Sequence, residues 1–185
     1  MRFKYLEPRT INEAVSLFFT HQGMVKVIAG GTDLISRIRL KQIEPEYVVD
    51  IGYIPGLDYI KYDAEGQMSI GALATIRSLE MSNEIQRRHP VISQAASQLG
   101  STAIRNVGTI GGNLCHASPS AETAPSLIVL GAEVKVVGPE GERTVELEKF
   151  FTGPGQTVLA SGAAAVRRAS RCALRPTLLA SVTPT

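Results

Sequence analysis

The hydrophobic pattern near the N-terminus predicts a helix, a strand and a second helix, in that order. Thr10 and Glu13 have the spacing of a capping box, and the apolar residues that follow fall on one helical face as far as Gly23. A short apolar run at residues 25–29 predicts a buried strand. Apolar residues return with helical spacing from Asp33 to about Lys41. A glycine-bearing segment therefore joins the predicted strand to the second helix.

The remainder of the chain alternates between predicted strands and predicted helices. The predicted strands are residues 47–51, 57–62 with 68–73 as one hairpin, and 133–137 with 143–147 as another. The predicted helices are 75–88, 90–99 and 124–130, the first capped by Thr75 and the second opened by Pro90. Strands and helices are mixed without a regular βαβ repeat. The fold class is therefore predicted as α+β rather than a doubly wound sheet.

The stretch from residue 161 to residue 185 differs in composition from the preceding sequence. It is rich in alanine, arginine and serine, contains no acidic residue and shows no clear periodicity. Two interpretations are open, a disordered basic tail or an abnormal end to the reading frame. Alanine runs are what leucine codons of the CTG type give out of register, which favours a frameshift after about residue 160. Resequencing of the gene tests this hypothesis.

Composition restricts the classes of function. With 185 residues and 44% hydrophobic content, the chain can form one ordinary domain or two small lobes that share a cleft. There is no basic stripe with interleaved aromatics for nucleic acid, no apolar run of about 20 residues for a membrane span and no signal peptide. Cys115 and Cys172 do not form a Cys-x-x-Cys pattern, so no metal site is expected. We expect a soluble cytoplasmic protein.

Two short segments about eighty residues apart carry the most specific signal. Each pairs adjacent glycines with hydroxyl and polar neighbours, Gly-Gly-Thr-Asp at residues 30–33 and Thr-Ile-Gly-Gly-Asn at residues 109–113. Glycine can adopt positive φ and places no Cβ between main-chain N–H groups and an anion, so consecutive amides can converge on phosphate oxygens. One such pair is most often a tight turn. Two pairs with matching neighbours predict a ligand with two phosphates.

The spacing of both segments argues against the common nucleotide-binding motifs. The first lacks Gly-x-Gly-x-x-Gly, although Asp50 lies about where the ribose-binding acid of a Rossmann fold would be. No lysine follows either segment closely enough for a P-loop. Cys115 and His116 are adjacent, but without a second cluster they are expected to pack in a loop. No catalytic residue is predicted.

With the residues Ala-Ser-Pro-Ser-Ala-Glu at 117–122, the two segments resemble the flavin-binding medium subunit of molybdenum hydroxylases. This family includes subunits of xanthine dehydrogenase, carbon monoxide dehydrogenase and nicotinate dehydrogenase. The resemblance covers about residues 1–160. It implies a two-lobed FAD-binding domain of the vanillyl-alcohol oxidase and p-cresol methylhydroxylase type, lacking the C-terminal domain of the family. The implied lobes are residues 1–55 and 56–160, with FAD between them.

The resemblance also implies roles for individual residues. The first segment would wrap the pyrophosphate with backbone amides, and the second would approach it through the Thr109 hydroxyl and the Gly111 and Gly112 amides. Glu122 stands where family members commonly have Asp. Leu99 aligns with an apolar position beside the adenine, although a helix residue that faces the core is as well supported. The implied cofactor-binding residues are Ile28, Ala29, Gly30, Gly31, Thr32, Asp33, Leu34, Leu99, Thr109, Ile110, Gly111, Gly112, Asn113 and Glu122.

The function implied by the resemblance is electron transfer within a complex. A molybdopterin-containing large subunit would oxidise the substrate, a small subunit would carry electrons through two [2Fe–2S] clusters, and FAD would pass them to NAD or another acceptor. The chain alone is expected to be an inactive part of this oxidoreductase. Two alternatives remain: a stand-alone flavin oxidoreductase of the same domain type, and a truncated non-catalytic nucleotide-binding module.

Overall fold

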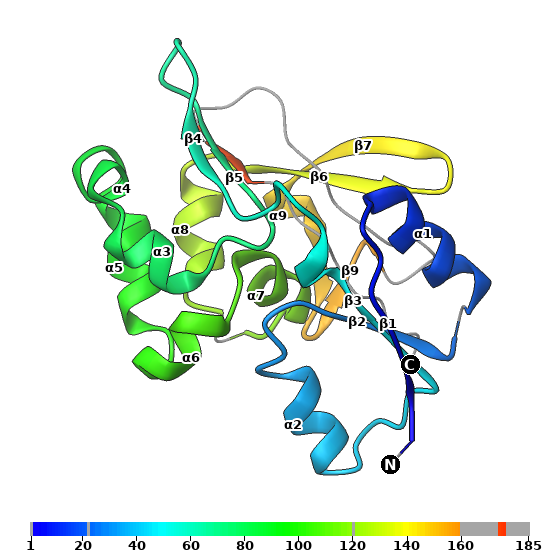
Figure 1. Ribbon diagram of the computed structural model, residues 1–185. Coiled ribbons are helices and arrows are strands. Elements are labelled where there is room, and N and C mark those ends of the chain that lie inside the picture. The colour runs from blue at the N-terminus through cyan, green and yellow to red at the C-terminus, as the bar shows by residue number, and fades with distance from the viewer. Residues whose placement is uncertain (1, 22, 120, 160–173, 177–185) are drawn as a thin grey trace.

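The computed structural model describes residues 2–21, 23–119, 121–159 and 174–176. The first 53 residues contain a small parallel sheet (Figure 1). Its elements are β1 (Lys4–Leu6), α1 (Ile11–Thr20), β2 (Val25–Ile28), α2 (Leu34–Arg39), β3 (Tyr47–Asp50) and the 3-10 helix η1 (Ile51–Tyr53). Strand β3 lies between β1 and β2 and is parallel to both. The carboxyl end of β2 therefore leads directly into the first glycine segment.

The parallel β-α-β-α-β order of this part is a finding that the hydrophobic pattern did not predict. Strand β1 has only three residues, and its partner lies more than 40 residues along the chain, in the register Lys4 to Tyr47. Local alternation carries no signal for such a pairing. The capped helix, the strand at residue 25 and the second helix are confirmed. Thr10 accepts a hydrogen bond from the Glu13 amide at 3.1 Å, as the capping box predicts.

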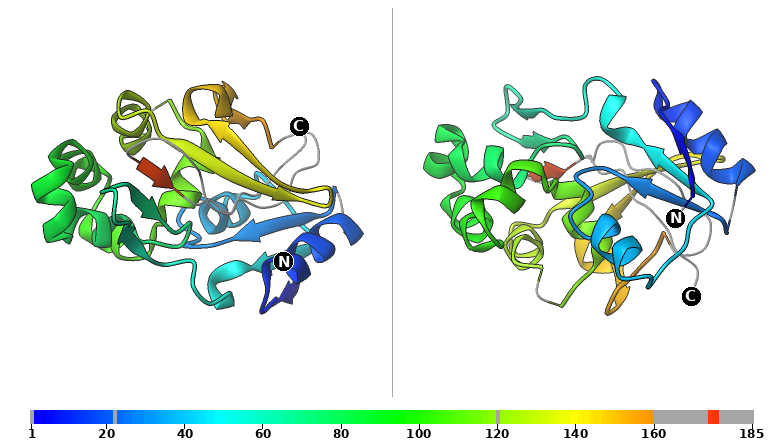
Figure 2. Two further views of the ribbon diagram at one scale, coloured as in Figure 1. Left: turned by 90° about the horizontal axis from the view of Figure 1, so that it is seen from above. Right: turned by 60° about the horizontal axis from the view of Figure 1, so that its bottom comes forward.

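Helices dominate the middle of the chain. They follow the hairpin of β4 (Ile60–Tyr62) and β5 (Met68–Ile70), which is antiparallel as predicted. The helices are α3 (Ile76–Met81), α4 (Asn83–Arg88), α5 (Pro90–Gln98), α6 (Thr102–Val107), α7 (Ile110–His116) and α8 (Thr123–Val129). Helices α3, α4, α5 and α6 gather at one end of the molecule, away from the parallel sheet (Figure 2).

Three details of these helices correct the prediction. The helix expected over 75–88 is broken into α3 and α4 because Ser82 leaves the helical conformation and caps α4, accepting from the Ile85 amide at 3.3 Å. Helix α6 was not predicted. The second glycine segment is not a loop but the first turn of α7, because Thr109 caps the helix there.

The C-terminal part contains a second antiparallel hairpin, as predicted. Its elements are β6 (Glu133–Gly138), β7 (Gly141–Glu146), α9 (Leu147–Phe150), β8 (Phe151–Gly153), β9 (Gln156–Thr157) and β10 (Leu174–Pro176). Strand β10 pairs in parallel with β5. Apart from β10, the predicted tail at 161–185 lies outside the described residues. No helix among the residues that the structure describes is long and apolar enough to cross a membrane.

One continuous hydrophobic core joins these elements. It includes Phe18 of α1, Val49 of β3, Ile70 of β5, Leu127 of α8 and Phe150 of α9, all almost fully buried. The mixed arrangement confirms the α+β class. The core includes residues on both sides of residues 55 and 56. The boundary between two lobes that is predicted there stays a prediction.

Candidate functional site

The first glycine segment is a turn between β2 and α2 that packs against residues 107–108, immediately before the second segment. A Cβ added to Gly30 would lie 1.9 Å from the Val107 carbonyl oxygen, so only glycine permits this backbone contact. Gly31 has a φ of +72°, which favours glycine as well. The first α2 amide that bonds back along the helix is that of Ile35, to the Gly31 carbonyl at 3.0 Å. The amides of residues 32–34 precede that bond and, by helix geometry, have no intrahelical acceptor.

The second glycine segment differs because its amides are engaged within the fold. The Ile110 amide donates to the Ala74 carbonyl and the Gly111 amide to the Ala72 carbonyl, both at 2.9 Å. The Gly112 amide donates to the Thr109 hydroxyl oxygen at 3.1 Å. This arrangement contradicts the expectation that the Gly111 and Gly112 amides are free to donate to a phosphate, because the first already donates to Ala72 and the second to the Thr109 cap of α7.

Two side chains of the second segment keep donors for a ligand. The Thr109 hydroxyl oxygen accepts the Gly112 amide, which leaves its O–H to donate elsewhere. The Asn113 side-chain oxygen accepts from the Thr123 hydroxyl, which leaves its NH2 group as a donor. The second segment can therefore offer side-chain donors where the first offers backbone amides.

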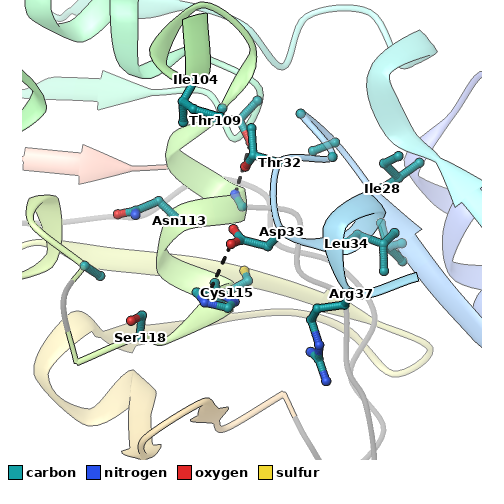
Figure 3. Close-up of a pocket in the computed structure, with 18 of the residues that line it drawn as sticks. Ile28, Thr32, Asp33, Leu34, Arg37, Ile104, Thr109, Asn113, Cys115 and Ser118 are labelled. Atoms are coloured by element: carbon teal, nitrogen blue, oxygen red, sulfur yellow. Dashed lines mark hydrogen bonds and ion pairs between the residues drawn. The ribbon is translucent and has the colours of Figure 1, made fainter. Parts of the chain in front are cut away.

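A cavity of about 600 Å³ lies between the two segments (Figure 3). Every predicted site residue lines it except Ile110 and Gly111, which are buried beneath. Leu99, Gly100 and Ile104 form part of its wall from the α5–α6 corner. These residues give the cavity an apolar surface beside its polar centre.

Several lining residues were not predicted from the sequence. Lys26 and Arg37 line the cavity from β2 and α2, and Gln156 lines it from β9. Lys26 lies two positions before Ile28 on a strand, and Arg37 lies three positions after Leu34 on a helix. Both spacings place them on the same face as a predicted site residue, a signal that could have found them. Gln156 has no comparable signal in the sequence.

The charges around the cavity are mixed. Burial lowers the pKa of Lys26, and the neighbouring Arg37 lowers it further. Asp33 Oδ1 and His116 Nε2 lie 3.8 Å apart at the cavity. Burial raises the pKa of the Cys115 thiol, so this cysteine is neutral and poorly suited to nucleophilic or metal chemistry.

Asp50, at the position of a Rossmann ribose-binding acid, has a structural role instead. Its Oδ1 accepts the Gly52 amide at 2.7 Å and caps η1, and its other oxygen accepts the Tyr5 hydroxyl. Burial and this hydrogen bond raise the pKa of Tyr5. Asp50 is not among the residues that line the cavity. The site is therefore not a Rossmann site.

The donors of this cavity fit a dinucleotide with a central diphosphate. Residues 32–34, whose amides have no intrahelical acceptor, line the cavity together with Thr109 and Asn113, and so do the basic residues Lys26 and Arg37. Residues 1–167 match the family described as "FAD binding domain in molybdopterin dehydrogenase". The chain belongs to this family. The chain therefore has an FAD-binding domain, and beside its cavity Gly30 lies directly against the Val107 carbonyl.

Individual relatives agree with this assignment. The chain is 34% identical to the carbon monoxide dehydrogenase medium chain of Hydrogenophaga pseudoflava over 85% of its length and 55% of that protein. It is 36% identical to the nicotinate dehydrogenase FAD-subunit of Eubacterium barkeri, over 83% and 52%. The chain thus spans about half the length of these curated relatives.

Solved structures confirm the fold of this FAD-binding domain. Carbon monoxide dehydrogenase from Hydrogenophaga pseudoflava superposes with a TM-score of 0.83 at 34% identity, covering 86% of this chain and 55% of that one. Quinoline 2-oxidoreductase from Pseudomonas putida 86 superposes with a TM-score of 0.84 at 27% identity, covering 90% and 57%.

Proposed function

We propose that this chain is the FAD-binding part of a molybdenum hydroxylase, in which FAD receives electrons from [2Fe–2S] clusters of a small subunit and passes them to NAD or another acceptor. The observation that carries the proposal is the contact of the two glycine segments at Gly30, which places both sets of donors around one cavity. A molybdopterin-containing large subunit would oxidise the substrate. Bound FAD supplies the redox chemistry.

The residues of this chain would bind and orient the cofactor. The amides of residues 32–34 would donate to the diphosphate from one wall, and the Thr109 hydroxyl and the Asn113 NH2 group would donate from the other. Neutral N–H dipoles can hold an anion without a lysine in the motif. Leu99 and Ile104 would exclude water from one end of the cavity. Glu122, exposed at the start of α8, would contact a polar part of the nucleotide.

Support for the partners comes from the names of the relatives. One is the medium chain of carbon monoxide dehydrogenase and another is an FAD-binding subunit of xanthine dehydrogenase, from Escherichia coli O157:H7. Both names describe one subunit of a larger assembly. By analogy, this chain would act with a large and a small subunit.

An FAD titration of the purified chain, followed by flavin absorption and fluorescence, tests the cofactor. We expect saturable binding of one FAD per chain, and no binding would contradict the proposal. Co-expression with the molybdenum and iron–sulfur subunits of the same organism tests the complex. Co-purification supports it. Flavin reduction by an organic substrate without partners would indicate a stand-alone oxidoreductase, and FAD binding with neither result would indicate a non-catalytic module.

A further inference from the structure

The Arg105 side chain is the centre of a hydrogen-bond network beside the cavity. Its Nε donates to Glu80 Oε2 at 2.8 Å, and its Nη1 donates to the Leu99 and Gly100 carbonyls at 3.1 and 2.9 Å. Its Nη2 donates to the Thr102 hydroxyl at 3.2 Å. The side chain is 11% exposed. A planar guanidinium can make all these bonds at once, which a lysine ammonium cannot.

The carbonyls that Arg105 binds belong to the cavity wall. Leu99 ends α5, and Gly100 has a φ of +48°, so the chain turns sharply between α5 and α6. Leu99, Gly100 and Ile104 all line the cavity. Arg105 therefore ties this corner to Glu80 on α3, across the turn.

Helix α6 depends on these polar bonds because it has little apolar anchoring. None of its residues is buried, and Ile104 and Val107 are 39% and 51% exposed. Its C-terminal residue, Val107, presents the carbonyl against which Gly30 packs. A shift of α6 would move both the apolar wall and the contact between the two glycine segments.

We propose that Arg105 is a positioning residue of the FAD site, which fixes the α5–α6 corner and helix α6 as one wall of the cavity. The inference rests on the proposed function of this cavity in binding FAD. Arg105 does not itself line the cavity, so it acts through Leu99, Gly100 and Ile104.

Arg77 provides a matched control. Its Nη1 binds the same Glu80 Oε2 at 2.9 Å, but it lies on α3, is 36% exposed and does not line the cavity. Hydrogen bonds from Arg77 and then from Arg105 lower the pKa of Glu80, so both arginines stabilise this carboxylate. Only Arg105 joins the carboxylate to the wall.

The test compares FAD affinity and thermal stability of the full chain carrying Arg105→Gln, Arg105→Lys or Arg77→Gln. We expect Arg105→Gln to weaken FAD binding at least tenfold and Arg77→Gln to change it less than about threefold, with each affinity measured well below the melting temperature of the apo variant. Arg105→Lys keeps the positive charge beside Glu80 but lacks the planar guanidinium with its several donors. It should therefore lose nearly as much FAD affinity as Arg105→Gln. If Arg105→Gln does not fold, Arg105→Lys carries the comparison.

A double-mutant cycle with Leu99→Ala separates positioning from general destabilisation. If Arg105 acts through the wall, the double variant loses less affinity than the product of the two single losses. Amide hydrogen exchange of apo residues 99–107 should rise in the Arg105 variants and not in Arg77→Gln. Equal affinity losses for Arg105→Gln and Arg77→Gln, multiplicative losses in the cycle, or unchanged exchange would overturn the proposal. Wild-type chain that does not bind FAD, with exchange raised as expected, would overturn only the proposed function.

Discussion

The two glycine segments look alike in sequence but have different tasks in the structure. Residues 30–33 form an open turn, in which Gly30 permits a backbone contact with Val107 and the following amides precede the first bond of α2. Residues 109–113 form a capped first helical turn, in which the amides of Ile110, Gly111 and Gly112 already have acceptors. The first segment can bind an anion with its backbone, whereas the second can do so with its side chains.

This difference changes how the site must be tested. Substitutions in the first segment change how closely the backbone at Gly30 can approach the Val107 carbonyl. The chemistry of the new side chain is therefore a poor guide to their effect. Substitutions in the second segment can remove a single donor and leave the fold in place.

Gly30→Ala should abolish FAD binding, because the added Cβ would lie 1.9 Å from the Val107 carbonyl oxygen. Overpacking of this kind destabilises by about 1–3 kcal/mol. Gly71→Ala is the control, since its Cβ would lie 2.2 Å from the Leu57 carbonyl oxygen, outside the cavity. Chemical unfolding should show comparable losses for both, but an FAD titration should show lost binding only for Gly30→Ala. Normal FAD affinity in Gly30→Ala would show that the contact between the segments is not needed.

Asn113→Asp should weaken FAD by tenfold or more, about 1.4 kcal/mol. The carboxylate can still accept from Thr123 but replaces an NH2 donor with a negative charge beside the diphosphate. Asn12→Asp, exposed on α1, adds the same charge far from the cavity and should leave affinity unchanged. Isothermal titration measures both. Equal FAD affinities for the two variants would show that Asn113 does not contribute to FAD binding.

Thr109→Val should cost about 1 kcal/mol of stability through the lost cap of α7 and should also weaken FAD severalfold. Thr75→Val loses an equivalent cap on α3, where the hydroxyl accepts from the Ser78 amide at 3.0 Å, but Thr75 does not line the cavity. Thermal melts should therefore be similar and FAD affinities different. Thr109→Ser should restore both properties. An affinity of Thr109→Val equal to that of Thr75→Val would mean that the Thr109 hydroxyl only caps the helix.

Asp33→Asn should change apo stability by less than about 0.5 kcal/mol, because exposed ion pairs contribute little. The pair with His116 spans 3.8 Å between partly exposed side chains, and Asp33 makes no cap bond to α2. Denaturant unfolding of the apo chain measures the effect. A loss above 1 kcal/mol would show that this pair, rather than the Gly30 contact, joins the two segments.

Much of the fold follows from local sequence signals, but the pairings do not. The Thr10 cap and the two hairpins were predictable because capping and alternation are properties of adjacent residues. Strand β1 was missed because its three residues are defined by a distant parallel partner. Helix α7 was missed because its glycine pair suggests a loop, whereas the Thr109 cap and the partners at residues 72–74 decide the conformation.

In the site, too, local sequence signals predicted some features, whereas features that depend on distant partners were missed. The two motifs located the cavity but less than half of its lining, because glycine and hydroxyl residues at fixed spacing are a strong signal for phosphate binding. The state of the amides could not be predicted, since the acceptors of Gly111 and Ile110 lie on another segment. Arg105 was missed because most of its partners are carbonyl groups and a distant carboxylate, which leave no motif.

The most direct test of the division between the two segments is a backbone amide NMR titration of the isotopically labelled chain with FAD. We predict large shift changes, and slowed exchange, for the amides of residues 32–34, with small changes for Ile110 and Gly111. The Asn113 side-chain NH2 signals should move with the first group. Large changes at Gly111 with small ones at residues 32–34 would show instead that the second segment binds the diphosphate with its backbone.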